Sequence, residues 1–138
     1  MRRVLAPGGT LVSTVWCSVP PLAAAVAAAL TRHLSAETAK SSLVPFVFGD
    51  AEVIKALFVD SGFRDIELET FSVERRLGPA AESIADELAS VPYANEVAEL
   101  AKPMRDPLIH DVTDGLQEFR KDGGFAIPQR THLFRATA

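Results

Sequence analysis

Cysteine, tryptophan and tyrosine each occur once in this chain of 138 residues, and methionine occurs twice. The lone Cys17 excludes a disulfide within the chain and a cysteine-based zinc site, and it is typical of a protein from a reducing compartment. The 14 basic residues are outnumbered by 18 acidic ones and form only short pairs such as Arg2-Arg3 and Arg75-Arg76. We therefore expect no nucleic-acid partner.

The sequence also lacks a hydrophobic run of membrane-spanning length. Its most apolar segment, PPLAAAVAAAL at residues 20–30, is shorter than the roughly 20 residues that a membrane helix needs, and Arg32 and His33 follow it. Because the segment is internal, it is not a signal peptide. With 48% hydrophobic and 23% charged residues, the composition predicts a single domain over Met1–Ala138, cytoplasmic and without a membrane partner.

Glycine occurs at eight positions, and no two of them form a Gly-x-Gly pattern. Nucleotide-binding loops between a strand and a helix usually carry that pattern. The three histidines, His33, His110 and His132, show no metal-ligand spacing, and no motif pairs Cys17 with a base. We expect no metal site, interpret each histidine as solvated or hydrogen-bonded, and identify no catalytic residue.

The first half of the chain predicts a strand and two helices. MRRVLAPGGTLVSTVW is typical of a last helical turn, a Pro-Gly-Gly turn and a strand over residues 10–16. An apolar residue at every fourth position from Leu22 to Leu34 gives one stripe on an alanine-rich helix. FGDAEVIKALFVDSGF predicts a helix capped by Asp50 and stopped at Gly62. The expected buried face of this helix is Val53, Ile54, Leu57 and Phe58.

The second half predicts a strand, a group of helices and a last strand. DIELETF alternates Ile66, Leu68 and Thr70 with Glu67, Glu69 and Phe71, which suits a strand with one buried face. A helix with Ile84, Leu88 and Val91 is expected to end near Pro92, and a short helix over residues 93–101 near Pro103. The stripe of Leu108, Ile109, Val112, Leu116 and Phe119 predicts a helix that stops at Asp122-Gly123-Gly124. Residues 131–137, after Pro128, predict the last strand.

Three segments in order carry a resemblance to a known family. RRVLAPGGTLVSTVW, FGDAEVIKALFVDSGFRDIELETF and DGGFAIPQRTHLFRATA together resemble the C-terminal half of class I S-adenosylmethionine-dependent methyltransferases, of the small-molecule group that includes the ubiquinone and menaquinone methyltransferases. The resemblance covers essentially the whole chain. It implies an α/β fold, namely the C-terminal half of a Rossmann-like methyltransferase sheet, with strands equivalent to 5, 6 and 7 and several covering helices.

The sequence lacks the cofactor-binding half that the family has. In the family, the half before this point holds a glycine-rich loop and an acidic residue that bind S-adenosylmethionine, and neither is present here. We therefore expect that this chain alone does not bind the cofactor and has no cofactor-binding residue. Met1 is interpreted as an internal methionine of a longer ancestor or of a misplaced gene start.

The function implied is that of the acceptor-side portion of a methyltransferase that acts on a small molecule. Such a portion would be inactive unless an upstream segment or a partner chain complements it. The alternative is a non-catalytic remnant that binds a ligand or oligomerises. In the family, the loop after strand five and the later helices line the acceptor pocket, which makes Trp16, Phe46 and Phe48 candidate substrate-binding residues. The competing interpretation of all three is ordinary packing.

One edge of the implied sheet has no neighbour within the chain. In the family, strand five lies between strands four and seven, so strand 10–16 would expose unpaired backbone groups on one side. Exposed edges of that kind pair with something. We therefore expect a homo-oligomer or a complementing chain to pair through the edge of residues 10–16.

Overall fold

In the computed structural model of this protein, residues 1–89, 94–100 and 102–138 are described, and they form two compact units. The sheet unit consists of Met1–Ser18, Phe46–Val73 and Arg130–Ala138. The helical unit consists of Val19–Pro45 and Glu74–Gln129. The fold is mixed α/β, as predicted from the sequence.

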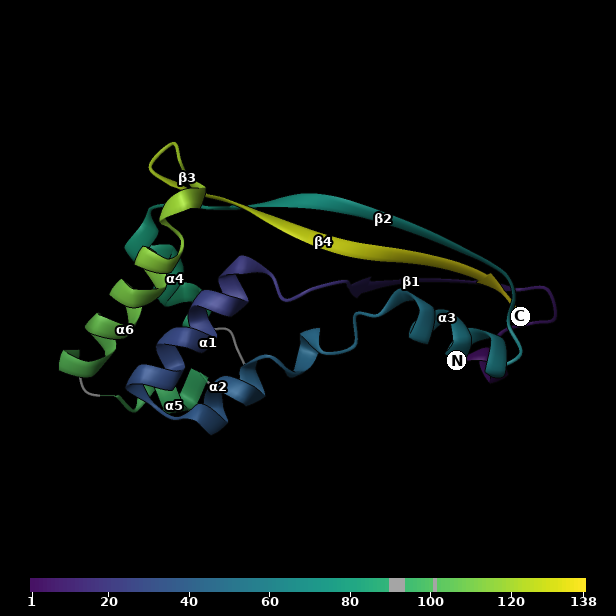
Figure 1. Ribbon diagram of the computed structural model, residues 1–138, viewed down its shortest axis with the longest axis horizontal. Coiled ribbons are helices and arrows are strands. Elements are labelled where there is room, and N and C mark those ends of the chain that lie inside the picture. Colours follow the sequence, from purple (N-terminus) through teal and green to yellow (C-terminus); the bar gives the residue numbers. More distant parts are fainter. Residues whose placement is uncertain (90–93, 101) are drawn as a thin grey trace. The chain divides into compact units, whose positions relative to one another are not determined.

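The sheet has its C-terminal strand in the middle. Strands β1 (Thr10–Trp16), β4 (Gly124–Thr137) and β2 (Arg64–Leu77) are hydrogen-bonded in the order β1-β4-β2 (Figure 1). β1 and β4 are antiparallel, with Thr10 opposite Thr137 and Trp16 opposite Thr131. The resemblance implied this insertion of the last strand beside the first, and β1 accordingly lies at one end of the strand order.

Helix α3 (Ala51–Asp60) supplies the apolar cover of the sheet unit. The Asp50 carboxylate accepts hydrogen bonds from the backbone N–H groups of Glu52 and Val53, as expected of an N-cap. Gly62, at φ +81°, ends the helix in the left-handed conformation. The Phe58 ring stacks on that of Phe134 at 5.5 Å, and Phe63 is buried beside Ala136 and Ala138.

The expected buried face of α3 is only half buried. Ile54 is 3% exposed, whereas Val53 and Leu57 are 50% and 48% exposed. On β2, Leu68 is also largely exposed and only Ile66 of the expected face packs into the cluster. The prediction of a continuous buried face was wrong because the sheet ends at β1 and is too narrow to cover the whole apolar side of α3.

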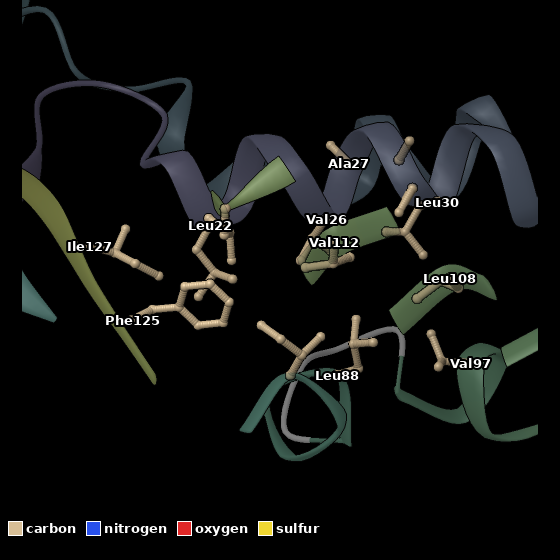
Figure 2. Packing of buried hydrophobic residues seen from close by; sticks show 14 residues of the cluster. Leu22, Val26, Ala27, Leu30, Leu88, Val97, Leu108, Val112, Phe125 and Ile127 are labelled. Atoms are coloured by element: carbon tan, nitrogen blue, oxygen red, sulfur yellow. The ribbon is translucent and has the colours of Figure 1, made fainter. Parts of the chain in front are cut away.

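The helical unit is built on α1 (Pro21–His33) and α6 (Lys102–Gly115), with α2 (Ala36–Ser42), α4 (Ala80–Ala89) and α5 (Ala94–Ala98). Figure 2 shows Val26 and Leu30 of α1 facing Leu108 and Val112 of α6. The four-residue stripe predicted on α1 is therefore confirmed. Short 3-10 turns lie at Arg2–Val4, Val44–Phe46 and Gln117–Phe119.

The predicted short helix before Pro103 is present as α5, and Pro103 lies at the start of the next helix. α6 begins at Lys102 and runs through Pro103 and Pro107 to Gly115. Pro103 is tolerated because it is the second helical residue, whose N–H has no partner within the helix in any case. The predicted contribution of Val91, and the ends of the helix expected over residues 93–101, lie outside the described residues.

The last strand begins seven residues earlier than predicted. β3 (Arg120–Lys121) and β4 form a hairpin through Asp122 and Gly123, which both have positive φ, 51° and 81°. Such a pair is typical of a two-residue hairpin turn with an Asp-Gly sequence. Pro128 is tolerated within β4 because β1 ends opposite Thr131, so β1 does not reach it.

Asp111 joins α6 to α1. Its carboxylate accepts a hydrogen bond from Nε2 of His33 at 2.9 Å and one from a guanidinium nitrogen of Arg32 at 3.0 Å. The hydrogen bond from His33, followed by that from Arg32, lowers the pKa of Asp111 from its ordinary value near 3.8. Asp111 therefore favours the folded state in its ionised form.

We expect Asp111→Asn to make the free energy of unfolding less dependent on pH in the acid range. A carboxyl whose pKa is lowered by folding contributes stability above its unfolded pKa, and this contribution is lost as the pH falls through its folded pKa. Below about pH 4, the parent chain should lose stability more steeply than the variant in urea titrations. Asp106→Asn, an exposed change on the same helix, serves as control. If the free energy of unfolding falls equally steeply below about pH 4 in the parent chain and in Asp111→Asn, the lowered pKa of Asp111 is contradicted.

Among the described residues, no helix is both long and apolar enough to cross a membrane.

Candidate functional site

Trp16 and Phe46 come together at the C-terminal end of β1. Their ring centroids are 6.1 Å apart and their planes are inclined by 50°. Both side chains are half-buried, so part of each remains exposed to solvent. Ligands in open α/β sheets bind outside the carboxyl ends of strands. The pair can stack on a flat, partly apolar molecule.

Phe48 does not join this pair. It is 47% exposed and lines a hollow of about 270 Å³ between β1 and α3. The other residues that line the hollow are Met1, Arg2, Ser13, Val15, Ile54, Leu57, Phe58, Ser61 and Phe63. The structure therefore splits the three predicted binding residues between the Trp16–Phe46 pair and a separate apolar hollow.

The three histidines each contact a hydroxyl or a carboxylate. Nδ1 of the buried His132 is hydrogen-bonded to Oγ1 of Thr70 at 2.7 Å, and its ring lies edge-on to Phe134. His33 is bound to Asp111, and His110 lies 3.4 Å from Asp114 on the same helix. Cys17 is half-buried with a free thiol. These contacts agree with the interpretation of the histidines as hydrogen-bonded residues.

The side chains that line the hollow do not fit S-adenosylmethionine. The ribose hydroxyls of an adenosine group are usually held by an acidic side chain, and the residues that line this hollow include no Asp or Glu. Its polar side chains are Arg2, Ser13 and Ser61. In the described part of the chain, no cluster of three or more His, Cys, Asp or Glu residues could hold a metal ion.

Sequence analysis missed most of the hollow. Ser13 and Val15 belong to the predicted strand, but their position beneath Phe58 follows only from the packing of α3 on the sheet. The period-two pattern of residues 10–16 places Ser13 and Val15 on one face. It does not reveal that this face is left partly open.

A second hollow lies beside the start of the chain. It is lined by Arg2, Arg3 and Arg64, together with Leu5, Ala6, Pro7, Gly8, Ser61 and Ala138. The guanidinium of Arg2 packs over Gly62, where an added Cβ would lie 3.3 Å from it. At this end of α3, Arg2 is placed to interact favourably with the negative end of the helix dipole.

The chain is similar to a methyltransferase of known structure. The chain aligns over 98% of its length with Haemonchus contortus phospholethanolamine N-methyltransferase 2, determined in complex with phosphomonomethylethanolamine and S-adenosylhomocysteine, at 21% identity and a TM-score of 0.37. The aligned part is 28% of that protein, so this chain spans less than a third of its length. No family model and no curated protein matches the sequence.

Proposed function

We propose that this chain is the acceptor-side portion of an S-adenosylmethionine-dependent methyltransferase that acts on a small molecule. The strand order β1-β4-β2 supports the proposal, because the last strand is inserted antiparallel beside the first. The sequence landmarks fall at the matching places. The turn at residues 7–9 leads into β1, and Gly62-Phe63 leads from α3 into β2.

The proposed portion depends on another segment for its cofactor. The apolar hollow has no acidic side chain for a ribose, and the sequence has no Gly-x-Gly loop. Transfer of a methyl group requires the donor to be held in line with the acceptor. This chain would thus position the acceptor, while a partner or an upstream segment would bind S-adenosylmethionine.

The acceptor site is proposed at Trp16 and Phe46, at the end of β1. Their half-buried rings provide a stacking surface for a flat acceptor. Phe48 is a second candidate through the neighbouring hollow. Methyl transfer to an ionised hydroxyl or to a carbanion needs little beyond such positioning.

Ligand binding by the isolated chain can be followed through Trp16, the only tryptophan. We expect flat phenols or quinols to quench its fluorescence with weak, saturable affinity. Phe46→Leu should weaken that binding by about two- to tenfold, since a stacking aromatic contributes about 0.5–1.5 kcal/mol. Phe48→Leu is the matched control. A larger effect of Phe48→Leu than of Phe46→Leu would move the site to the hollow.

Calorimetric titration with S-adenosylhomocysteine tests whether the cofactor is bound by another segment. The isolated chain should give no binding. A fusion of a class I cofactor half to its N-terminus should bind about tenfold more tightly than the cofactor half alone, because completing the sheet raises the populated fraction of the binding-competent state. Micromolar binding by the isolated chain would overturn the proposal that the cofactor site lies elsewhere. A fusion without any gain would favour the alternative function, a remnant that only binds a ligand or oligomerises.

A further inference from the structure

The backbone of β1 exposes one row of hydrogen-bonding groups. At one end of the strand pair, the N–H of Cys17 donates to the carbonyl of Arg130, and at the other the N–H of Ala138 donates to the carbonyl of Gly9. In an antiparallel pair, the residues that face the neighbouring strand alternate. Odd-numbered positions of β1 therefore face β4. The N–H and C=O groups of Thr10, Val12 and Thr14 point away from it.

Only one end of this edge is covered. The chain at Gly49 passes so close that an added Cβ would lie 2.8 Å from the carbonyl oxygen of Trp16. In the described residues, no strand adjoins β1 on the side away from β4. The open edge therefore extends from Thr10 to Thr14.

The two edges of the sheet differ in their charge. β1 reads TLVSTVW, without a charged residue or a proline. β2, at the opposite end of the strand order, reads RDIELETFSVERRL and carries charges along its length. Charged side chains protect edge strands from pairing, and β1 has none. The edge suited to pairing is therefore that of β1.

Apolar side chains lie next to the open edge. Val12 is 60% exposed, and Leu57 and Phe48 border the hollow beside β1 while remaining nearly half exposed. A pair of short strands alone buries far less than the roughly 1,600 Å² of a standard interface. Leu57 and Phe48 lie on the face of the sheet that α3 covers, and Val12 lies on the opposite face, so apolar area is available on both faces beside this edge.

We propose that two copies of this chain pair through their β1 edges, antiparallel, with Val12 on the two-fold axis. Val12 then lies opposite Val12 of the second copy, and Thr10 lies opposite Thr14, so the outward groups of all three residues are paired. A two-fold arrangement is closed, so it leaves no further β1 edge exposed. The inference does not rest on the proposed enzymatic role.

The charges around α3 fit the same two-fold arrangement. α3 runs opposite to β1, because its start follows Gly49 near Trp16 and its end at Ser61 lies beside Arg2. The axis places the two α3 helices on one face of the joined sheet, with opposite ends facing each other. The Arg2 and Arg3 end of one copy therefore lies nearest the Asp50 and Glu52 end of the other, which brings opposite charges together.

Sedimentation equilibrium of the full chain tests the pairing. We expect a mass of twice 14.8 kDa at high micromolar concentration, in reversible exchange with the monomer. V12K and V12E should each dimerise about tenfold more weakly, since like charges then face each other across the axis. Mixing the two variants should restore a dimer. V73K places the same change on the 41% exposed Val73 of β2 and should leave the dimer unchanged.

Amide exchange measured by NMR on the unmodified chain gives an independent reading. Above the dimer dissociation constant, the N–H groups of Val12 and Thr14 should exchange roughly tenfold more slowly than in dilute solution. A monomer at high micromolar concentration would overturn the proposal, as would amide exchange at Val12 that is independent of concentration. A dimer that V73K weakens and V12K does not would place the interface on β2 instead.

Discussion

Replacing Gly124 by alanine is expected to cost about 3 kcal/mol or more in the free energy of unfolding. Gly124 begins β4 and is buried where β4 passes the end of β2. An added Cβ would clash with the carbonyl oxygens of Leu77 and Gly78, which are backbone atoms and have no rotamer by which to move aside. The strands would have to separate, which breaks the packing of Phe125 and Ile127 against the helices. Urea denaturation followed by circular dichroism measures the loss.

Gly123→Ala is the matched control for this prediction. Gly123 precedes Gly124, and an added Cβ there meets nothing within 4 Å, but its φ of +81° disfavours a side chain. We expect a loss of about 1 kcal/mol from that backbone strain. If Gly124→Ala is no more destabilising than Gly123→Ala, the close approach of the two strands is contradicted.

Local patterns predicted the elements whose structure depends on neighbours in sequence. Asp50 and Gly62 mark the two ends of α3, and the four-residue stripe of Leu22, Val26 and Leu30 identifies the buried side of α1. These signals work because capping and helical periodicity are set within one or two turns. The same holds for β1, which begins directly after its glycine turn.

Burial could not be predicted in the same way. Val53 and Leu57 continue the apolar face of α3 in the sequence, yet they are exposed because the sheet under that helix ends at β1. A periodic pattern tells which residues share a face, and it does not tell how wide the opposing surface is. Their exposure follows only from the strand order, and it is the same strand order that leaves the β1 edge open.

In the candidate site, too, the local sequence predicted the position of a residue in its strand but not its tertiary contacts. Trp16 was placed at the end of its strand by the sequence alone, and its contact with Phe46 follows from the course of the chain between α2 and α3. Phe48 lies only two residues further on and borders the hollow between β1 and α3 instead. The alternation of Phe46 and Phe48 suggested one pocket, because residues two apart in an extended segment point to the same side. Phe46 instead ends the 3-10 turn Val44–Phe46, so that spacing does not place the two rings together.

Phe134→Ala is expected to cost about 3–5 kcal/mol in the stability of the sheet unit. Phe134 is fully buried on β4, with the ring of Phe58 stacked on it at 5.5 Å and His132 edge-on at 6.0 Å. It joins α3 to the sheet, so its removal leaves a cavity in the small apolar cluster of this unit. Phe48→Ala, at a largely exposed ring, should cost less than about 1 kcal/mol. The loss is measured by urea denaturation, and similar losses in the two variants would contradict this packing.

Two spectroscopic probes together test whether the chain unfolds as one domain. Trp16 belongs to the sheet unit, so its fluorescence reports unfolding there, whereas most of the helical circular dichroism arises from α1, α2, α4, α5 and α6 of the other unit. In a single cooperative domain, as predicted from the composition, Phe134→Ala shifts both transitions equally, because every part of a two-state protein unfolds together. A shift confined to the Trp16 signal would show that the units unfold separately, and the prediction of one domain would then be wrong. In that case the sheet unit would unfold with a free energy of its own, and pairing through β1 would raise that free energy with protein concentration.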